Sequence, residues 1–392
     1  MRTQPERSSP SRLLLVANTA WYLRKYRARL VDRLEAQGWQ VTLCAPPDAD
    51  AEFPFFSERR YVPLRLSRKG LNPFWEAGAL LKTYLLLRRE RPDLVLTWTP
   101  KPNLYSSIAG RLLRIPVVPN VSGLGAVFVR NGWLARVVGF GYRFAFAKSP
   151  RVFFQNEDDR AAFADAGWVA RARSELLPGS GVDLDAYRPA PLPAGEFTFL
   201  FLGRLLADKG LRELVAAARS LRGEGRRFVL RVAGPLDNGN PAAISDAEWQ
   251  TWIQEKIVEP LGMLEDVRPA LLSAHCVVLP SYREGLPRSL LEAAATARPV
   301  ITTDAVGCRD AVDAGQSGFL CKVGDAESLA ECMRRMLDMP TAALTAMGQA
   351  GRAWVERHFS EEEVFDAYLR VCSANLRSKP IWNAGDIDTL RY

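Results

Sequence analysis

The feature that most constrains this chain is an alternation of strand and helix patterns, which runs through the first half and then starts again in the second. The apolar run RLLLVAN (12–18) is typical of a buried strand. A helical pattern follows it as far as Leu34, and WQVTLCAPP (39–47) indicates a second strand. The same alternation predicts helices near 75–90, 103–113 and 133–147 and strands at 93–98, 116–121 and 151–156. Such alternation predicts a parallel sheet covered by helices on both faces.

A segment dense in proline and glycine, residues 177–196, separates the two runs. After it the pattern restarts with a strand at 197–205 and a helix from Leu211. Because 392 residues are too many for one core, we expect an α/β protein of two Rossmann-like, doubly wound domains. Their expected bounds are 1–188 and 189–365, followed by a C-terminal helix and tail over 366–392. Ligands of such sheets bind outside the carboxyl ends of the strands, so we expect the active site in the interdomain cleft.

The net charge of +8 is unevenly distributed. Residues 1–188 hold 29 lysines and arginines against 17 acidic residues, whereas the remainder of the chain holds 23 against 27. A basic first half indicates an anionic partner such as nucleic acid, acidic lipid or a phosphorylated substrate, or simply a solvated face. Aromatic residues alternate with the charges at 21–30 and 133–148, and such stretches can lie among lipid headgroups, so we expect contact with an anionic membrane surface.

Several protein classes are disfavoured by motifs that are missing from the sequence. No apolar run is long enough to span a membrane and the polar opening does not resemble a secretion signal, so we expect a cytoplasmic protein that can associate peripherally with the inner face of the membrane. Asn18-Thr19-Ala20 follows the first strand where a nicotinamide dehydrogenase has a glycine-rich turn, and there is no P-loop. Six scattered cysteines and two isolated histidines, His275 and His358, do not have the spacing of metal ligands. We therefore expect no metal and no cofactor.

Two glutamates flank the start of a predicted helix in SYREGLPRSLLEAAATARPVITTD (281–304). Pro287 fits the first turn of that helix, because its missing N–H is not needed there. The backbone N–H groups of Gly285 and Leu286, together with the helix dipole, then form a site suited to a diphosphate. Glycine at this point allows close approach of the ligand.

If the helix starts near Leu286, Glu292 lies about two turns into it, on the side that also carries Ser289. A carboxylate at that position suits a ribose diol. Glu284, on the preceding loop, is placed for the hydroxyls of a sugar attached beyond the phosphates. Taken alone, an apolar helix with two glutamates is more often structural.

A second segment, FLGRLLADKGLREL (201–214), supplies cations. Arg204 and Lys209 leave the carboxyl end of the first strand of the second domain on one short loop, so both can reach one diphosphate. Two cations facing a helix N-terminus would stabilise a departing nucleoside diphosphate. The alternative is an ordinary solvated basic loop.

Together with GVDLDAYRP (181–189) and VGCRDAVDAGQSGFL (306–320), these segments resemble the retaining family 4 glycosyltransferases of the GT-B fold. The resemblance covers nearly the whole chain in order. In the first half, SRKGLNPF (67–74), TPKPNLYSSIAGRL (99–112) and SGLGAVF (122–128) are similar to bacterial enzymes that add a sugar, often N-acetylgalactosamine in α-1,3 linkage, to undecaprenyl-diphosphate-linked glycans.

The resemblance implies a role for each matching residue. Arg204 and Lys209, beside Gly203, would bind the donor diphosphate, with Glu284 acting on the donor sugar and Glu292 on the ribose. The amides around Gly285, Leu286 and Pro287, near Ser289, would bind phosphate or sugar. Family members usually retain the anomeric configuration, and the resemblance implies a front-face path in which the leaving phosphate oxygen accepts the proton of the acceptor hydroxyl. Catalysis then consists of leaving-group stabilisation and positioning, with Glu284, Arg204 and Lys209 as the catalytic residues.

The acceptor side is expected in the first domain, to which the C-terminal helix of the family returns. Many relatives have a glycine pair where this chain has Asn18-Thr19, and a histidine where Pro100 and Lys101 stand. The acceptor-side candidates are Asn18, Thr19, Tyr22, Arg24, Lys101, Gly123 and Gly125. Arg24, Lys25, Arg27 and Arg29 would form a face that contacts the membrane or grips a lipid diphosphate, or an ordinary basic amphipathic helix.

Other interpretations remain open from the sequence. A sugar-nucleotide 2-epimerase shares the architecture but usually needs histidines in the cleft, and a degenerate membrane-docked scaffold would keep the fold without the chemistry. Nucleic-acid binding ranks third, because no recognised module accompanies the charge. Asp48-Ala49-Asp50 and Asp183-Leu184-Asp185 have the D-x-D form, and we interpret both as surface loop acids rather than metal ligands.

Overall fold

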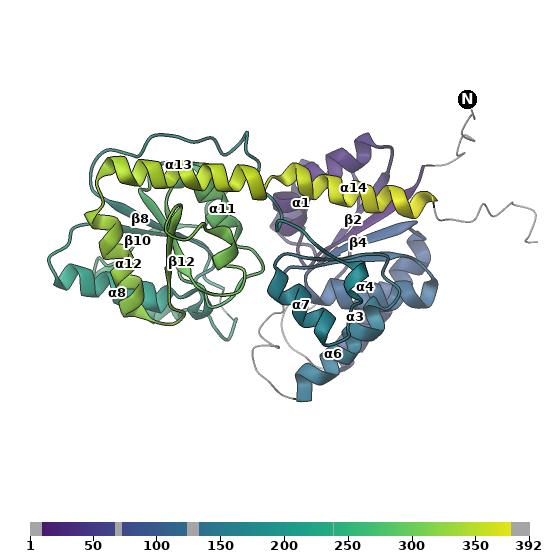
Figure 1. The fold of residues 1–392 in the computed structure, drawn as a ribbon. Helices are drawn as coiled ribbons and strands as arrows, with labels where there is room; N and C mark the ends of the chain where they lie inside the picture. Colours follow the sequence, from purple (N-terminus) through teal and green to yellow (C-terminus); the bar gives the residue numbers. More distant parts are fainter. Residues whose placement is uncertain (1–9, 67–72, 124–132, 238, 378–392) are drawn as a thin grey trace, which may run out of the picture.

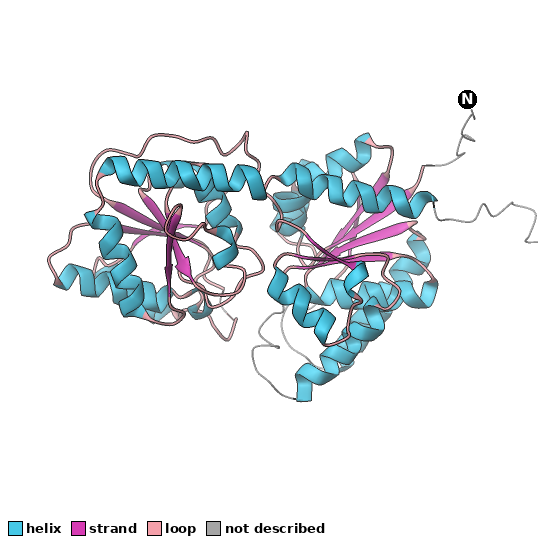
Figure 2. Cartoon of the chain, in the orientation of Figure 1, coloured by secondary structure: helices cyan, strands magenta, loops and turns pink. Residues whose placement is uncertain are grey.

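The computed structural model of the chain describes residues 10–66, 73–123, 133–237 and 239–377. It contains two parallel sheets, each with helices packed against it (Figures 1 and 2). Both sheets have the doubly wound strand order, in which the chain runs outward from a central strand to one edge and then returns to build the other half. The prediction of an α/β protein with two Rossmann-like domains is confirmed.

The first sheet has seven strands in the order β3-β2-β1-β4-β5-β6-β7. Its strands are β1 (Arg12–Val16), β2 (Gln40–Ala45), β3 (Arg60–Pro63), β4 (Leu94–Trp98), β5 (Val117–Val121), β6 (Val152–Phe154) and β7 (Ser174–Leu176). Its α-helices are α1 (Ala20–Ala36), α2 (Pro54–Ser57), α3 (Pro73–Glu90), α4 (Pro100–Leu113), α6 (Trp133–Phe146) and α7 (Glu157–Asp165), with 3-10 turns η1 (Ala49–Glu52) and η2 (Arg171–Arg173). The central strand β1 pairs in parallel with β2 and β4, so that Leu13 lies beside both Val41 and Leu94.

The second sheet has six strands in the order β10-β9-β8-β11-β12-β13. Its strands are β8 (Thr198–Leu202), β9 (Val229–Ala233), β10 (Glu259–Gly262), β11 (Cys276–Leu279), β12 (Val300–Thr303) and β13 (Gly318–Cys321). Around it lie α8 (Leu211–Gly223), α9 (Asp246–Gln254), α10 (Arg268–Leu272), α11 (Arg288–Ala295), α12 (Ala326–Asp338) and α13 (Thr341–His358), with turns η3 (Ala207–Lys209) and η4 (Arg309–Ala311). Strands β8 and β11 are buried along their whole length, which explains their continuous apolar runs.

The C-terminal helix α14 (Glu361–Arg377) lies against the first domain, whereas α13 runs along the second (Figure 1). Its apolar residues, which include Val364, Phe365 and Tyr368, share one core cluster with the strands of the first sheet. The buried Tyr368 hydroxyl accepts hydrogen bonds from Trp98 Nε1 and Asn120 Nδ2, both at 2.8 Å. The end of the chain that the structure describes is therefore anchored in the domain where the chain began.

Three global features accompany this fold. All six cysteines are buried and none is in a disulfide. No helix in the described ranges combines the length and apolar character that crossing a bilayer requires. Among the same residues, no three His, Cys, Asp or Glu side chains converge as a metal site would demand. The tail from residue 378, for which the sequence suggested no role, lies outside the described residues.

Candidate active site in the cleft between the domains

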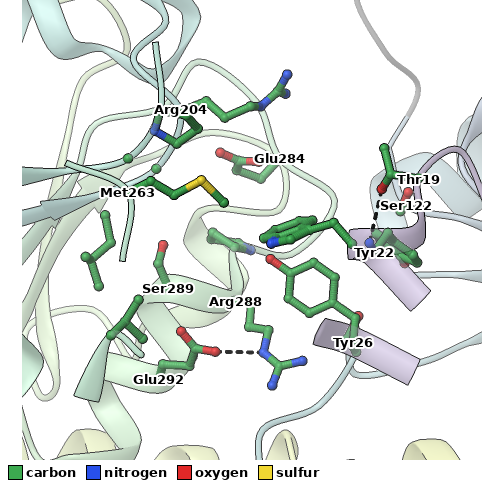
Figure 3. A pocket seen from close by; sticks show the side chains of 18 of the residues that line it. Thr19, Tyr22, Tyr26, Ser122, Arg204, Met263, Glu284, Arg288, Ser289 and Glu292 are labelled. Atoms are coloured by element: carbon green, nitrogen blue, oxygen red, sulfur yellow. Dashed lines mark hydrogen bonds and ion pairs between the residues drawn. The ribbon is translucent and has the colours of Figure 1, made fainter. Parts of the chain in front are cut away.

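A cavity with a volume of about 680 Å³ lies between the two domains. Residues that follow the carboxyl ends of the strands line it from both sides (Figure 3). Thr19, Thr99 and Ser122 contribute from the first domain, and Arg204 and Glu284 from the second. The two parallel sheets therefore aim the loops at their carboxyl ends at one space, where the sequence predicted the active site.

The two cations predicted to bind a diphosphate both line this cavity. Arg204, on the loop after β8 beside Gly203, is 48% exposed, and its guanidinium Nη1 lies 3.0 Å from the Asp237 carboxylate. Lys209 ends η3, and its ammonium forms an ion pair with the carboxylate of Glu284. The structure thus joins Lys209 directly to Glu284, whereas Arg204 is held by a carboxylate that the sequence analysis did not consider.

Helix α11 begins two residues later than the sequence predicted. Pro287 is its N-cap residue, with φ −77° and ψ 105°, and so does not lie in the first turn. The physical reason is that the proline ring disfavours the helical conformation for the residue before it, so Leu286 stays outside the helix and is buried. No side chain caps α11, so no capping side chain accepts from the first backbone N–H groups of this helix. The residues of its first turn, Arg288 and Ser289, line the cavity.

Glu292 lies one turn into α11 and lines the cavity, with only 8% of its surface exposed. Its carboxylate Oε1 accepts a hydrogen bond from Arg288 Nε at 2.7 Å. The second carboxylate oxygen points away from Arg288, on the side of Ser289 (Figure 3). Ser289 and Glu292 therefore lie on the same side of α11, as their spacing predicted. The hydrogen bond from Arg288 to Glu292 was not predicted from the sequence.

Gly285 is a point of contact between the domains. A Cβ atom on this residue would lie 2.7 Å from Gln155 Oε1 and still closer to the Ser122 carbonyl oxygen, both in the first domain. Its own carbonyl accepts a hydrogen bond from Asn156 Nδ2 at 2.8 Å. Gly123, predicted on the acceptor side, faces the same residue, because its Cβ would lie 3.5 Å from Gly285 N. The close approach at Gly285 is therefore to the neighbouring domain, which the sequence analysis did not foresee.

The acceptor-side candidates divide into two groups. Asn18, Thr19 and Tyr22 line the cavity, and Thr19 also caps α1 by accepting a hydrogen bond from Tyr22 N at 3.0 Å. Arg24 and Lys101 are not among the lining residues. Arg24 is ion-paired with Asp50 and Glu265, and Lys101 Nζ lies 2.6 Å from Glu76 Oε1. Gly125 lies outside the described residues.

The prediction of a free basic face on α1 is wrong. Lys25 Nζ lies 2.7 Å from Glu265 Oε1, and Arg29 is ion-paired with Asp183 and Glu361. Arg27 is 1% exposed, with its guanidinium 4.8 Å from the Trp98 ring centre. Lys25 and Arg29 are thus paired with carboxylates of the second domain, the interdomain segment and α14, whereas Arg27 is buried and donates to the hydroxyls of Tyr22 and Ser180.

The interpretation of the two D-x-D sequences as surface acids needs correction for Asp50 but holds for Asp185, which is exposed. Asp50 is 9% exposed, lines the cavity and is ion-paired with Arg24. Asp48 caps η1 and accepts a hydrogen bond from Trp21 N at 3.2 Å. Asp183 accepts hydrogen bonds from the backbone N–H groups of Asp185 and Ala186. Burial acts to raise the pKa of Asp183, but these hydrogen bonds and the Arg29 guanidinium outweigh burial and lower it.

The electrostatic character of the two cavity walls differs. Three cationic side chains line the cavity among the residues that the structure describes, and all three belong to the second domain: Arg204, Lys209 and Arg288. The described wall of the first domain instead carries hydroxyls, two aspartates and the aromatic residues Trp21, Tyr22 and Tyr26. A phosphate group is therefore favoured on the wall of the second domain and polyhydroxyl groups on that of the first.

Two tyrosines and a cysteine beside the site have shifted ionisation. Burial, reinforced by the Glu292 carboxylate, raises the pKa of Tyr26 and of Tyr187. Burial, again with a nearby carboxylate, raises the pKa of Cys308 to about 12. These groups therefore stay protonated at neutral pH, and Cys308 is not a reactive thiol.

The histidines lie elsewhere. His275 is buried, with its Nδ1 accepting a hydrogen bond from Thr198 N at 3.1 Å and its ring stacked on Phe197. His358 packs against Trp354, at 4.2 Å between ring centres. Neither lines the cavity, so neither can act on a ligand there.

Comparison with known proteins agrees with this geometry. Residues 196–339 match the family model described as glycosyl transferases group 1, and residues 23–179 match that of a glycosyl transferase 4-like domain. The capsular polysaccharide biosynthesis glycosyltransferase CapM of Staphylococcus aureus is 25% identical over 76% of this chain and 81% of its own length. The N,N'-diacetylbacillosaminyl-diphospho-undecaprenol alpha-1,3-N-acetylgalactosaminyltransferase of Campylobacter jejuni is 23% identical over 88% and 94% respectively.

Among solved structures, that of Anabaena Alr3699/HepE in complex with UDP and glucose superposes with a TM-score of 0.73 at 16% identity. The match covers 93% of this chain and all of that one. The two family models together account for both domains, and the structural likeness spans the cleft between them. The chain therefore consists of a glycosyl transferase 4-like domain followed by a glycosyl transferases group 1 domain, and is a glycosyltransferase of the GT-B fold.

Proposed function

We propose that this enzyme transfers a hexose or N-acetylhexosamine from a UDP-sugar to a lipid-diphosphate-linked or polysaccharide acceptor, with retention of anomeric configuration, in cell-surface glycan assembly. One observation carries the proposal. Arg204, Lys209 and the uncapped start of α11 converge on one wall of the interdomain cavity, with the carboxylates of Glu284 and Glu292 beside them. This set suits a nucleoside diphosphate whose sugar and ribose hydroxyls are bound by carboxylates.

Lys209 and Glu284 form an ion pair that donor binding would break. A diphosphate that binds the Lys209 ammonium competes with the Glu284 carboxylate for it. Glu284 is thereby released to accept hydrogen bonds from the hydroxyls of the donor sugar. As the bond between sugar and phosphate breaks, negative charge grows on the diphosphate, and Arg204 and Lys209 stabilise it most in the transition state.

Retention is supported by the chemistry of the lining residues. No histidine lines the cavity within the described part of the chain. Of the two lining aspartates, Asp50 is ion-paired with Arg24, and Asp48 accepts hydrogen bonds from the backbone of Trp21 and Asp50. A front-face path needs no protein base, because the leaving phosphate oxygen takes the proton of the acceptor hydroxyl. The protein then contributes positioning and electrostatic stabilisation.

A lipid-linked acceptor is supported by the named activity of the Campylobacter jejuni relative and by a surface of the first domain. Phe74, Trp75, Leu81 and Leu85 of α3 are 51 to 89% exposed, and Phe140 of α6 is 72% exposed. The α3 residues recur at helical spacing beside the exposed Lys82 and Arg88. An apolar stripe edged by cations is suited to anionic lipid, which would place the enzyme at the cytoplasmic face of a membrane.

The donor site is tested by isothermal titration with UDP, GDP and a panel of UDP-sugars. We expect micromolar binding of UDP that Arg204→Ala and Glu292→Ala each weaken about tenfold or more. Arg219→Ala, on the exposed surface of α8, serves as the matched control and should bind like the unsubstituted protein. Folded protein that binds no nucleotide would support the scaffold interpretation instead.

The reaction itself is tested with lipid-diphosphate-linked acceptors and NMR of the product linkage. Retention requires an α-linked product from an α-linked donor. A β-linked product would overturn the front-face path, and release of a 2-epimerised nucleotide sugar without transfer would identify an epimerase.

Membrane contact is tested by sedimentation with vesicles of anionic or neutral lipid. Trp75→Ser and Leu81→Ser should reduce binding to anionic vesicles, whereas Val323→Ser, at an exposed position of the second domain, should not. Equal sedimentation with both lipid compositions would contradict electrostatic docking.

A further inference from the structure

Arg288 stands at the first position of α11, and its side chain has been given no specific contact with the proposed donor above. A cation in the first turn of a helix lies near the positive end of the helix dipole, which is unfavourable. An arginine four residues before a glutamate is also the weaker order for a helical ion pair. Helix stability therefore does not explain why an arginine occupies this position.

The contacts of Arg288 join the two domains. Its Nε donates to Glu292 Oε1 at 2.7 Å, and its guanidinium carbon lies 4.9 Å from the ring centre of Tyr26 on α1 of the first domain. Figure 3 shows its side chain between the Glu292 carboxylate and the Tyr26 ring. All three side chains line the cavity.

The Tyr26 ring is itself held in place. It meets Trp21 and Tyr22 edge-on, each at 5.2 Å between ring centres. The Arg288 side chain is only 21% exposed, which strengthens both its hydrogen bond to the carboxylate and its attraction to the ring face. Arg288 thus links a fixed aromatic group of the first domain to a carboxylate of the second.

We propose that Arg288 is a positioning residue for the donor: it orients the Glu292 carboxylate for the ribose diol and, through Tyr26, ties that orientation to the contact between the domains. The inference rests on the proposed donor site, in which Glu292 binds ribose. Arg288 holds one carboxylate oxygen, the other lies on the side of Ser289, and the Tyr187 hydroxyl is a further neighbour of this carboxylate. Without Arg288, Glu292 would rotate among several rotamers and bind the diol less well.

The test compares UDP with 2′,3′-dideoxy-UDP, whose ribose lacks both hydroxyls, by isothermal titration of the full chain. The unsubstituted protein should prefer UDP by roughly tenfold or more, as expected for hydrogen bonds to a charged group. In Arg288→Met that preference should fall to about threefold or less, because UDP binding weakens while dideoxy-UDP binding is kept. Arg288→Lys should restore part of the preference. A merely structural defect would weaken both ligands equally.

The link to the first domain is tested in the same assay. Tyr26→Phe keeps the ring and should keep the preference, whereas Tyr26→Leu should reduce it. The double substitution Arg288→Met with Tyr26→Leu should be no worse than Arg288→Met alone, because both act through one contact.

Three outcomes separate this inference from the proposed function. If the unsubstituted protein binds UDP and Arg288→Met keeps its full preference, the role of Arg288 is overturned while the donor site stands. If Tyr26→Leu keeps the preference, the link to the first domain is overturned. Absence of UDP binding in the unsubstituted protein would remove the donor site itself.

Discussion

Replacing Gly285 by alanine should separate the two walls of the cleft. The added Cβ would lie 2.7 Å from Gln155 Oε1, whereas real Cβ atoms keep at least 3.0 Å, so the side chain would have to withdraw by about 0.3 Å or more. The Ser122 carbonyl oxygen is closer still and belongs to backbone, which cannot swing aside. Since both obstacles belong to the first domain, the strain is relieved most easily by moving one domain relative to the other.

The expected cost has two parts. Overpacking of this kind typically costs about 1–3 kcal/mol. Loss of the hydrogen bond from the buried Asn156 to the Gly285 carbonyl adds roughly 1–3 kcal/mol if Asn156 is left without a replacement. A misplacement of the first-domain wall by as little as ~1 Å can reduce turnover about 100-fold. We therefore expect kcat/KM to fall by roughly ten- to 100-fold, with UDP affinity changing less, because the proposed donor contacts lie in the second domain and are linked to the first through the contact of Arg288 with Tyr26.

The assay is transfer to a lipid-linked acceptor, run beside UDP titration and chemical denaturation. Gly223→Ala is the matched control, because a Cβ there would meet nothing within 4 Å and the residue lies in α8, where alanine is favourable. Normal turnover in Gly285→Ala would refute the argument that this contact sets the spacing of the walls. An equal loss of turnover and UDP binding would show that the substitution acts on the donor loop instead.

Three further predictions concern stability. Tyr368→Phe should lower the free energy of unfolding by about 2–4 kcal/mol in urea denaturation, because Trp98 Nε1 and Asn120 Nδ2 would both lose their buried acceptor. Arg298→Met should cost about 3 kcal/mol or more, since the fully buried guanidinium donates to several backbone carbonyls that would be left unpaired. Glu248→Gln should destabilise the protein at pH 7, because hydrogen bonding to an arginine lowers the pKa of Glu248 from 4.5 to about 2. That difference should be full above about pH 4.5 and vanish as the pH falls towards 2, which denaturation midpoints at pH 7, 4 and 3 would show.

Much of the architecture is readable from the sequence because it is local. The apolar runs of β1 and β8 each indicate a buried strand from only a few consecutive residues. The alternation of strands with helices then predicts that the strands are parallel. The same logic brings Arg204 and Glu284 to one cavity, because both follow carboxyl ends of neighbouring strands in one sheet. Their individual roles in catalysis remain predictions.

The features that the sequence analysis missed depend on partners far away along the chain. Arg24 and Lys25 contact Glu265, which lies 241 and 240 residues further on. Arg288 meets Tyr26 only because two separately folded domains face each other. A sequence pattern of about 10 to 20 residues does not show which distant residues will be in contact. The four cations of α1 therefore suggested an external anionic partner, whereas their partners lie within the protein.

The internal pairing changes the meaning of the charge asymmetry. The first half has the basic excess and the second half the acidic one, and α1 lies where they meet. Its cations pair with Glu265 of the second domain and with Glu361 and Glu362 of α14. Part of the basic excess therefore holds the domains together. Any attraction to anionic lipid must come from other cations, such as those beside the exposed stripe of α3, on a different part of the first domain from the carboxylate-paired α1.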